Sequence, residues 1–261
     1  MAVTSEDLFV YHEMTPADVE SYRELGYFHY GRALTDRGIE LLVEQIMVPW
    51  NRDMPPFDPN QGYRYNSQIT NLHRECEFLR RFYFDSPIVD ASVKIIGPNI
   101  KAAGMVTLFK MAGNPQPAEW HQDNIYGELY PHNTITCLAA LDDSTLETGC
   151  SWLIPGSHKQ GPVTFSYTAA DKASGKPVDI EVDESGQIPL ILKAGECALL
   201  HCHTLHRGGS NTSNKHRRLL FTRYADADAV EAYNNNAVRL GKLLRGTTRY
   251  DEVRRHEADL Q

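Results

Sequence analysis

The spacing of apolar residues changes near the middle of this chain, and that change limits the possible folds more than any other feature. From Gly104 onward the apolar residues gather in short runs separated by clusters of Gly, Pro, Asn and Asp. Such runs are typical of antiparallel strands, not of strands that alternate with helices. The sequence therefore predicts a sandwich or barrel built from the runs at 105–111, 133–141, 150–154, 188–192, 197–201 and 218–224.

The first hundred residues carry helix signals instead. Thr15 before Pro16 is typical of an N-cap residue followed by the first helical position. Ser86 and Pro87 open a second such segment, which Gly97 closes. We predict a single domain that is mainly β with flanking α-helices: a helical N-terminal part over about 1–100, a β-core over about 101–225 and a C-terminal helix over about 226–245.

Composition indicates a globular protein that acts on a small molecule. The 261 residues are 41% hydrophobic, enough for a sizeable core, and the net charge of −8 opposes binding to nucleic acid or to an anionic membrane. No apolar stretch approaches the roughly 18 residues of a membrane span, and the N-terminus lacks a secretion signal. The five cysteines show no CxxC spacing. We therefore expect a soluble cytoplasmic protein with reduced cysteines.

One short motif, WHQDN at 120–124, places His121 two residues before Asp123. Far downstream, the run at 197–201 leads into His201, His203 and His206. Two imidazoles and one carboxylate are typical of the facial triad that holds non-haem Fe(II). A lone H-x-D pair is common by chance, so the distant histidine is needed to support a metal site, and the spacing leaves open which histidine that is.

Arg217 supplies a chemical partner for such a metal. It follows His206 with ten residues between them, which is enough for a turn and a return into the neighbouring strand. A guanidinium group binds a carboxylate with two parallel hydrogen bonds. A dicarboxylate with a chelating keto-acid end, such as 2-oxoglutarate, would then meet the metal at one end and arginine at the other. Arg218 is the alternative, since adjacent strand residues point to opposite faces, but the spacing favours Arg217.

Taken together, these motifs resemble the phytanoyl-CoA dioxygenase-like family of non-haem Fe(II)/2-oxoglutarate oxygenases, over roughly residues 20–225. The resemblance implies a double-stranded β-helix (jelly-roll, cupin-like) core. It also implies Fe(II) as the metal, 2-oxoglutarate and dioxygen as cosubstrates, and oxidation of an unactivated C–H bond by hydroxylation, ring closure or desaturation. The matching segments are 71–100, 120–124, 139–161, 194–211 and 216–221.

Carried over by position, the resemblance assigns His121, Asp123 and His206 as iron ligands, and Arg217 as the partner of the 2-oxoglutarate carboxylate. His201 is then expected to be structural. His203 has no family counterpart and is expected to face solvent or the substrate.

Two further residues are expected beside the cosubstrate. Some family members carry a tryptophan over the cosubstrate on the strand after H-x-D, and Leu138 takes that place here. Thr107, on the strand before H-x-D, is expected to offer a hydroxyl group.

The substrate is expected to be a small polar molecule, such as a natural-product or sugar-containing antibiotic intermediate, because hydrogen-bonding side chains lie around the motif. Two rival functions stay open: a non-catalytic jelly-roll binding module, and a cupin-type zinc enzyme that uses His201, His203 and His206. The expected substrate contacts are Asn66, Gln68, Asn124, Tyr126 and His203.

Overall fold

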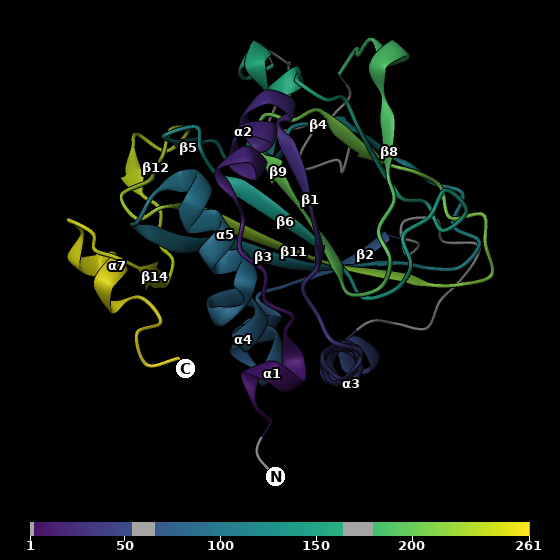
Figure 1. Ribbon diagram of the computed structural model, residues 1–261, viewed down its shortest axis with the longest axis horizontal. Coiled ribbons are helices and arrows are strands. Elements are labelled where there is room, and N and C mark those ends of the chain that lie inside the picture. Colours follow the sequence, from purple (N-terminus) through teal and green to yellow (C-terminus); the bar gives the residue numbers. More distant parts are fainter. Residues whose placement is uncertain (1–2, 54–65, 164–179, 261) are drawn as a thin grey trace.

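Two antiparallel sheets form the centre of the molecule in the computed structural model, which describes residues 3–53, 66–163 and 180–260 (Figure 1). The larger sheet has the order β1-β9-β6-β11-β3-β14, with β2 also paired to β3. Its strands are β1 (Tyr27–Arg32), β2 (Asn66–Thr70), β3 (Ile100–Lys110), β6 (Ile135–Ala140), β9 (Glu196–His201), β11 (Arg217–Asp226) and β14 (Leu243–Arg245).

The smaller sheet has four strands in the order β4-β10-β7-β8. They are β4 (Ala118–His121), β7 (Ser151–Leu153), β8 (Ile188–Leu190) and β10 (His206–Gly208). Leu153 and Leu190 of this sheet pack against Leu138 and Leu200 of the larger one in a single buried cluster. The two sheets therefore enclose an apolar layer between them, as in other sandwiches.

Strand β6 shows why these runs are continuously apolar. All six of its residues are buried. Leu138 and Ala140 belong to the cluster between the sheets, whereas Cys137 and Ala139 belong to the larger cluster on the other face. Because side chains alternate along a strand, a strand that is covered on both faces needs apolar residues at every position.

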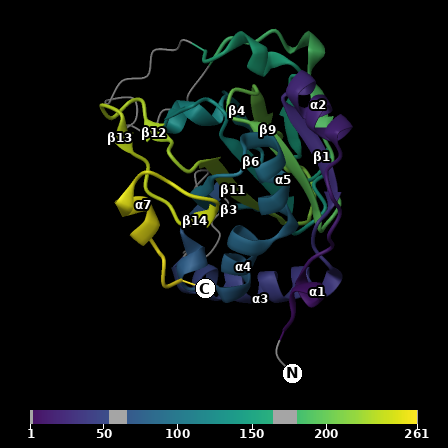
Figure 2. The same ribbon diagram turned by 60° about the vertical axis from the view of Figure 1, so that its left-hand side comes forward.

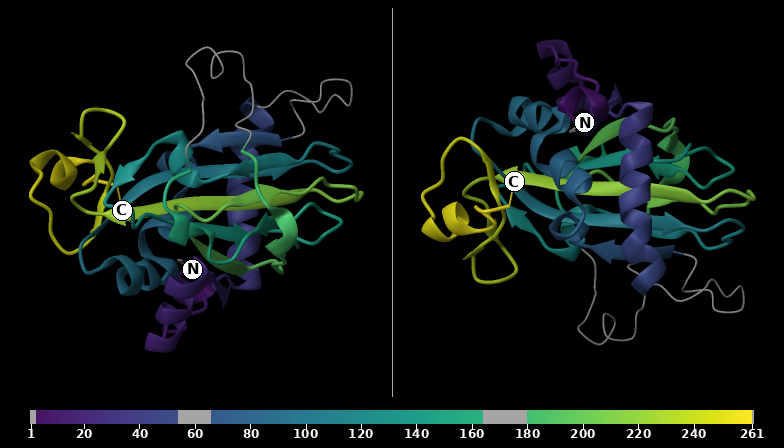
Figure 3. Two further views of the ribbon diagram at one scale, coloured as in Figure 1. Left: turned by 90° about the horizontal axis from the view of Figure 1, so that it is seen from above. Right: turned by 90° about the horizontal axis from the view of Figure 1, so that it is seen from below.

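Helices supply the cover on the outer face of the larger sheet. Seen from below, α3, α4 and α5 lie across its strands (Figure 3). Thr15 caps α2 through a reciprocal pair of hydrogen bonds with Asp18, and Gly97 ends α5, so both predicted boundaries are confirmed. The helices are α1 (Ser5–Leu8), α2 (Pro16–Leu25), α3 (Asp36–Asp53), α4 (Glu77–Asp85), α5 (Pro87–Ile96) and α7 (Asp251–Arg255).

The predicted C-terminal helix over about 226–245 is wrong. This segment holds three short strands instead, β12 (Val230–Glu231), β13 (Ala237–Val238) and β14. Asn235 and Asn236 adopt positive φ angles and turn the chain between β12 and β13. In this third sheet β12 pairs with β13 on one side and with β5 (Leu129–Tyr130) on the other. A side view shows these strands and α7 together at one end of the sandwich (Figure 2).

The fold class itself, mainly β with flanking helices, is confirmed, although the N-terminal part also contributes strands β1 and β2. The five cysteines are all buried and unpaired, as predicted. Within the described ranges, no helix has the length and apolar character needed to cross a membrane.

Candidate active site

The smaller sheet brings His121 and His206 side by side. They are direct partners in the register of β4 and β10, and their ring centroids lie 4.2 Å apart. Asp123 begins the 3-10 turn η3 (Asp123–Tyr126), and its Oδ1 lies 3.6 Å from His206 Nε2. One ligand atom from each of the three residues lies within 4.8 Å of the other two. The fold thus collects the three residues that the sequence singled out.

Hydrogen bonds orient each of the three groups. The Nδ1 atom of His206 lies 2.9 Å from the carbonyl oxygen of Thr204, and Nδ1 of His121 lies 2.8 Å from that of Glu119. Because a carbonyl only accepts, both Nδ1 atoms carry a proton, and Nε2 is the candidate ligand atom of each ring. Thr136 donates to Oδ2 of Asp123, which leaves Oδ1 on the histidine side.

The local electrostatics favour the protonation states that a metal ligand needs. Burial and the neighbouring His206 lower the pKa of His121, so its imidazole is neutral at physiological pH. Burial alone would raise the pKa of Asp123, but His206 and Arg223 together bring it below the ordinary value, so the carboxylate is ionised. Two imidazoles and one carboxylate, each held by a second hydrogen bond, are a donor set that fits a divalent iron ion.

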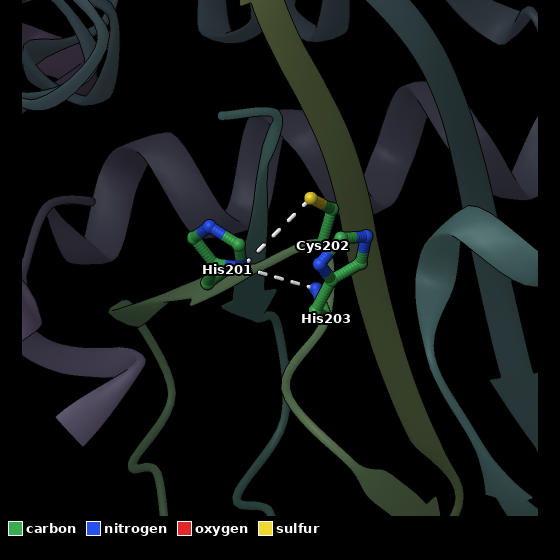
Figure 4. Close-up of side chains that lie close together, drawn as sticks. All are labelled: His201, Cys202 and His203. Carbon is green, nitrogen blue, oxygen red and sulfur yellow. Dashed lines mark hydrogen bonds between the residues drawn. The ribbon is translucent and has the colours of Figure 1, made fainter. Parts of the chain in front are cut away.

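The neighbouring histidines are engaged differently. Figure 4 shows Nδ1 of His201 in contact with both Cys202 and His203. This atom accepts the backbone N–H of His203 at 3.1 Å. Burial raises the pKa of the Cys202 thiol to about 12, so that group is not the thiolate that a metal requires. His201 therefore has a structural contact, as expected.

His203 is buried, at 2% exposure, so the expectation that it could face solvent is wrong. Its Nε2 lies 3.3 Å from the side-chain nitrogen of Asn124, whose oxygen in turn accepts from Arg223 at 3.2 Å. Within the described residues, the groups arranged to hold a metal include none that combines His201, His203 and His206. The ligand set of the rival zinc enzyme is thus not assembled.

The two candidate arginines have opposite surroundings. Arg217 is 1% exposed, its Nη1 lies 3.5 Å from the hydroxyl oxygen of Ser144, and its Nε has no hydrogen-bond partner among the described residues. Arg218 points the other way and forms a bidentate pair with Asp142, at 2.7 and 2.6 Å. Arg218 already has its carboxylate, whereas Arg217 has none among the residues that the structure describes.

Sequence reasoning missed Lys110, which lies directly opposite Arg217 in the register of β3 and β11. It is 1% exposed, and burial together with Arg217 lowers its pKa to about 7. The available signal was a lysine near the end of the largely apolar run at 105–111. Thr136 was missed as well, because the sequence does not reveal that β6 passes beside Asp123.

Leu138 and Thr107 lie on different faces of the larger sheet. Leu138 faces the layer between the sheets, where the sequence placed it. Thr107 lies on the same face of β3 as Met105 and Phe109, which pack in the helix-side cluster. It is also paired with Leu220 of that cluster. The expectation that Thr107 offers a hydroxyl to the cosubstrate is therefore wrong, because its side chain points away from Arg217.

The expected substrate contacts are only partly described. Asn124 is buried beside His203 and Arg223. Gln68 is exposed on the edge strand β2. The side chains of Asn66 and Tyr126 lie outside the described residues.

Comparison with known proteins now identifies the family. The model of the phytanoyl-CoA dioxygenase (PhyH) family matches residues 22–219. The phytanoyl-CoA dioxygenase domain-containing protein 1 of Danio rerio is 31% identical, over 79% of this chain and 88% of its own length. The probable alpha-ketoglutarate-dependent hypophosphite dioxygenase of Stutzerimonas stutzeri is 30% identical, over 65% of this chain and 64% of its own length.

Solved structures share the fold at lower identity. The non-heme alpha ketoglutarate dependent carbocyclase SnoK from nogalamycin biosynthesis superposes with a TM-score of 0.71 at 20% identity, covering 94% of this chain and 96% of its own. EvdO2 from Micromonospora carbonacea var. aurantiaca, complexed with 2-oxoglutarate, gives a TM-score of 0.68 at 20% identity, covering 87% and 96%. The family uses Fe(II), 2-oxoglutarate and dioxygen. This chain belongs to the phytanoyl-CoA dioxygenase family and is a non-haem Fe(II)/2-oxoglutarate-dependent dioxygenase.

Proposed function

We propose that His121, Asp123 and His206 hold the iron, and that Arg217 binds the distal carboxylate of 2-oxoglutarate. The observation that carries the assignment is the second hydrogen bond on each ligand group, which turns Nε2 of both histidines and Oδ1 of Asp123 toward one another. The buried Arg217 supports it, because a charged group taken out of water is costly without a partner. A carboxylate would supply that partner.

The residues around the triad have separate roles in this proposal. When bound, the iron and its cosubstrates supply the oxidation of an unactivated C–H bond. Thr136 keeps Asp123 in place, and the backbone carbonyls of Glu119 and Thr204 keep the two imidazoles in the tautomer that ligates. The apolar layer around Leu138 excludes water from the interior between the sheets.

For the substrate we propose a small polar molecule, oxidised by hydroxylation, ring closure or desaturation. Asn124, His203 and Arg223 form a connected polar group beside Asp123, and these side chains would accept and donate hydrogen bonds to such a molecule. SnoK and EvdO2 favour a natural-product intermediate, because SnoK acts in nogalamycin biosynthesis and both share this fold. Asn66, Gln68 and Tyr126 remain proposed contacts on the substrate side.

Anaerobic titration with Fe(II) and 2-oxoglutarate tests the site. We expect the weak visible charge-transfer band of the iron chelate in the wild-type protein and its loss in Asp123→Ala. No band from folded wild-type protein would contradict the proposal. Addition of dioxygen and a panel of polar natural products then tests the substrate class, with the yield of succinate per added compound as the measure.

A further inference from the structure

Lys110 and Arg217 place two cations next to each other inside the sandwich. The two residues are direct partners across β3 and β11, so their side chains leave the same face. Leu108 and Leu219, which precede and follow them on that face, belong to the layer between the sheets. Each of the two charged residues is 1% exposed.

Neither cation has an anionic partner in the part of the chain that the structure describes. Lys110 Nζ donates to the carbonyl oxygen of Gln116 at 3.1 Å and to that of Gly209. Among the described residues, Arg217 reaches only the hydroxyl of Ser144, at 3.5 Å. Burial raises the pKa of the nearby Cys150 thiol to about 11, so that group carries no charge. The charged neighbour of Lys110 is therefore another cation.

Lys101 shows what a buried lysine with a structural role looks like in the same strand. It is also fully buried and also donates to two carbonyl oxygens, those of Ala227 and Ala229. Asp226 and Asp228, however, lie close enough to oppose the effect of burial, and the pKa of Lys101 falls only to about 8. At Lys110 burial and Arg217 act in the same direction, and the pKa falls from 10.5 to about 7.

The position of the Lys110 ammonium group relates it to the metal site. A Cβ atom built on Gly208 would lie 3.8 Å from Lys110 Nζ. Gly208 follows His206 by two residues on β10, a spacing of roughly 6.6 Å along a strand. A five-carbon dicarboxylate has a comparable length, so one that chelated a metal at His206 would extend its far end toward Lys110 and Arg217.

We propose that Lys110 is a second cation for the distal carboxylate of 2-oxoglutarate, and that it takes up one proton from solvent when the carboxylate binds. The proposal rests on the function proposed above. In the protein without cosubstrate, deprotonation of Lys110 relieves its repulsion with Arg217. In the complex, the carboxylate lies between two charged donors and stabilises the ammonium form.

The coupling predicts a pH-dependent affinity for 2-oxoglutarate. Above about pH 7 each binding event must recruit a proton, so the dissociation constant should rise with pH, approaching tenfold per pH unit. Within the described part of the chain, the groups that face Lys110 are Arg217 from β11 and the carbonyl oxygens of Gln116 and Gly209. None of these groups titrates in this range.

Anaerobic calorimetry of the Fe(II)-loaded protein with 2-oxoglutarate, in two buffers of different ionisation enthalpy near pH 8, counts the protons. We expect an uptake approaching one proton in the wild type and in Lys101→Met, and none in Lys110→Met, whose affinity should fall roughly 10- to 100-fold. Lys110→Arg, which keeps the charge but does not titrate, should bind without proton uptake and with little pH dependence.

The outcomes separate this inference from the proposed function. If the wild type binds 2-oxoglutarate without proton uptake, or if Lys110→Met retains both the uptake and the affinity, Lys110 does not contact the carboxylate while the oxygenase site stands. If folded wild-type protein does not bind 2-oxoglutarate at all, the site assignment itself fails. Should Lys110→Met fold poorly, Lys110→Arg still decides the question through its proton count.

Discussion

Replacing Thr136 by valine should weaken metal binding without disturbing the fold. Thr136 donates its hydroxyl to Asp123 Oδ2, and this bond holds the carboxylate with Oδ1 toward His206. A hydrogen bond to a charged acceptor contributes about 1.5–3 kcal/mol. Loss of such an outer partner typically lowers metal affinity about 10- to 100-fold. At about 1.4 kcal/mol per factor of ten, the two ranges agree, so we expect a 10- to 100-fold loss for Thr136→Val.

The control is the same substitution at Thr107, which is also fully buried but faces the helices and whose hydroxyl has no hydrogen-bond partner in the described ranges. Thr107→Val should bind iron and 2-oxoglutarate like the wild type. Anaerobic competition titration with a chromogenic Fe(II) chelator measures both dissociation constants, and thermal unfolding of the metal-free proteins checks the fold. If Thr136→Val bound iron as tightly as Thr107→Val and the wild type, the reasoning would be refuted. If both variants lost the same amount of iron affinity relative to the wild type, the loss would be a general packing effect and the reasoning would be refuted as well.

Further expectations follow from the same geometry. Arg217→Met should weaken 2-oxoglutarate binding at least about 30-fold, because it removes one partner of a buried charge pair. Arg218→Met should leave that affinity unchanged and lower the free energy of unfolding by about 1 kcal/mol or less. If the anaerobic titration showed the larger loss of affinity in Arg218→Met, the assigned register would be overturned. His121→Ala should abolish stoichiometric iron binding and His203→Ala should preserve it, which metal analysis after desalting decides. Between about pH 7 and 8.5 the unfolded chain protonates Lys110 while the folded protein does not, so the free energy of unfolding should rise with pH by up to about 1.4 kcal/mol per unit. Urea denaturation of wild type and Lys110→Met measures this slope, and an equal slope in both proteins would contradict the lowered pKa.

Local chemistry explains which elements could be predicted. A helix cap depends on the residues next to it in the chain. Thr15 before Pro16 starts α2, and Gly97 after an apolar segment ends α5, so both boundaries could be read from adjacent residues. The C-terminal segment depends on distant partners instead. Strand β14 exists because it pairs with β3, more than a hundred residues earlier, and this pairing outweighs a helical spacing of apolar residues.

Within the candidate site, the sequence by itself determined the kinds of groups present and their order along the chain: His121 and Asp123 in one motif, His206 far downstream, and Arg217 beyond it. Those residues were identifiable because iron and carboxylate chemistry restricts the side chains that can serve.

Only the tertiary structure decided which face each side chain occupies. Thr107 and Lys110 lie three residues apart on one strand, so they point to opposite faces, and the pairing with β11 puts Lys110 beside Arg217. The same folding brings Thr136 of β6 to Asp123 and pairs Arg218 with Asp142. Because one residue of register reverses every side chain of a strand, these contacts follow from pairings between distant strands, which no local pattern specifies.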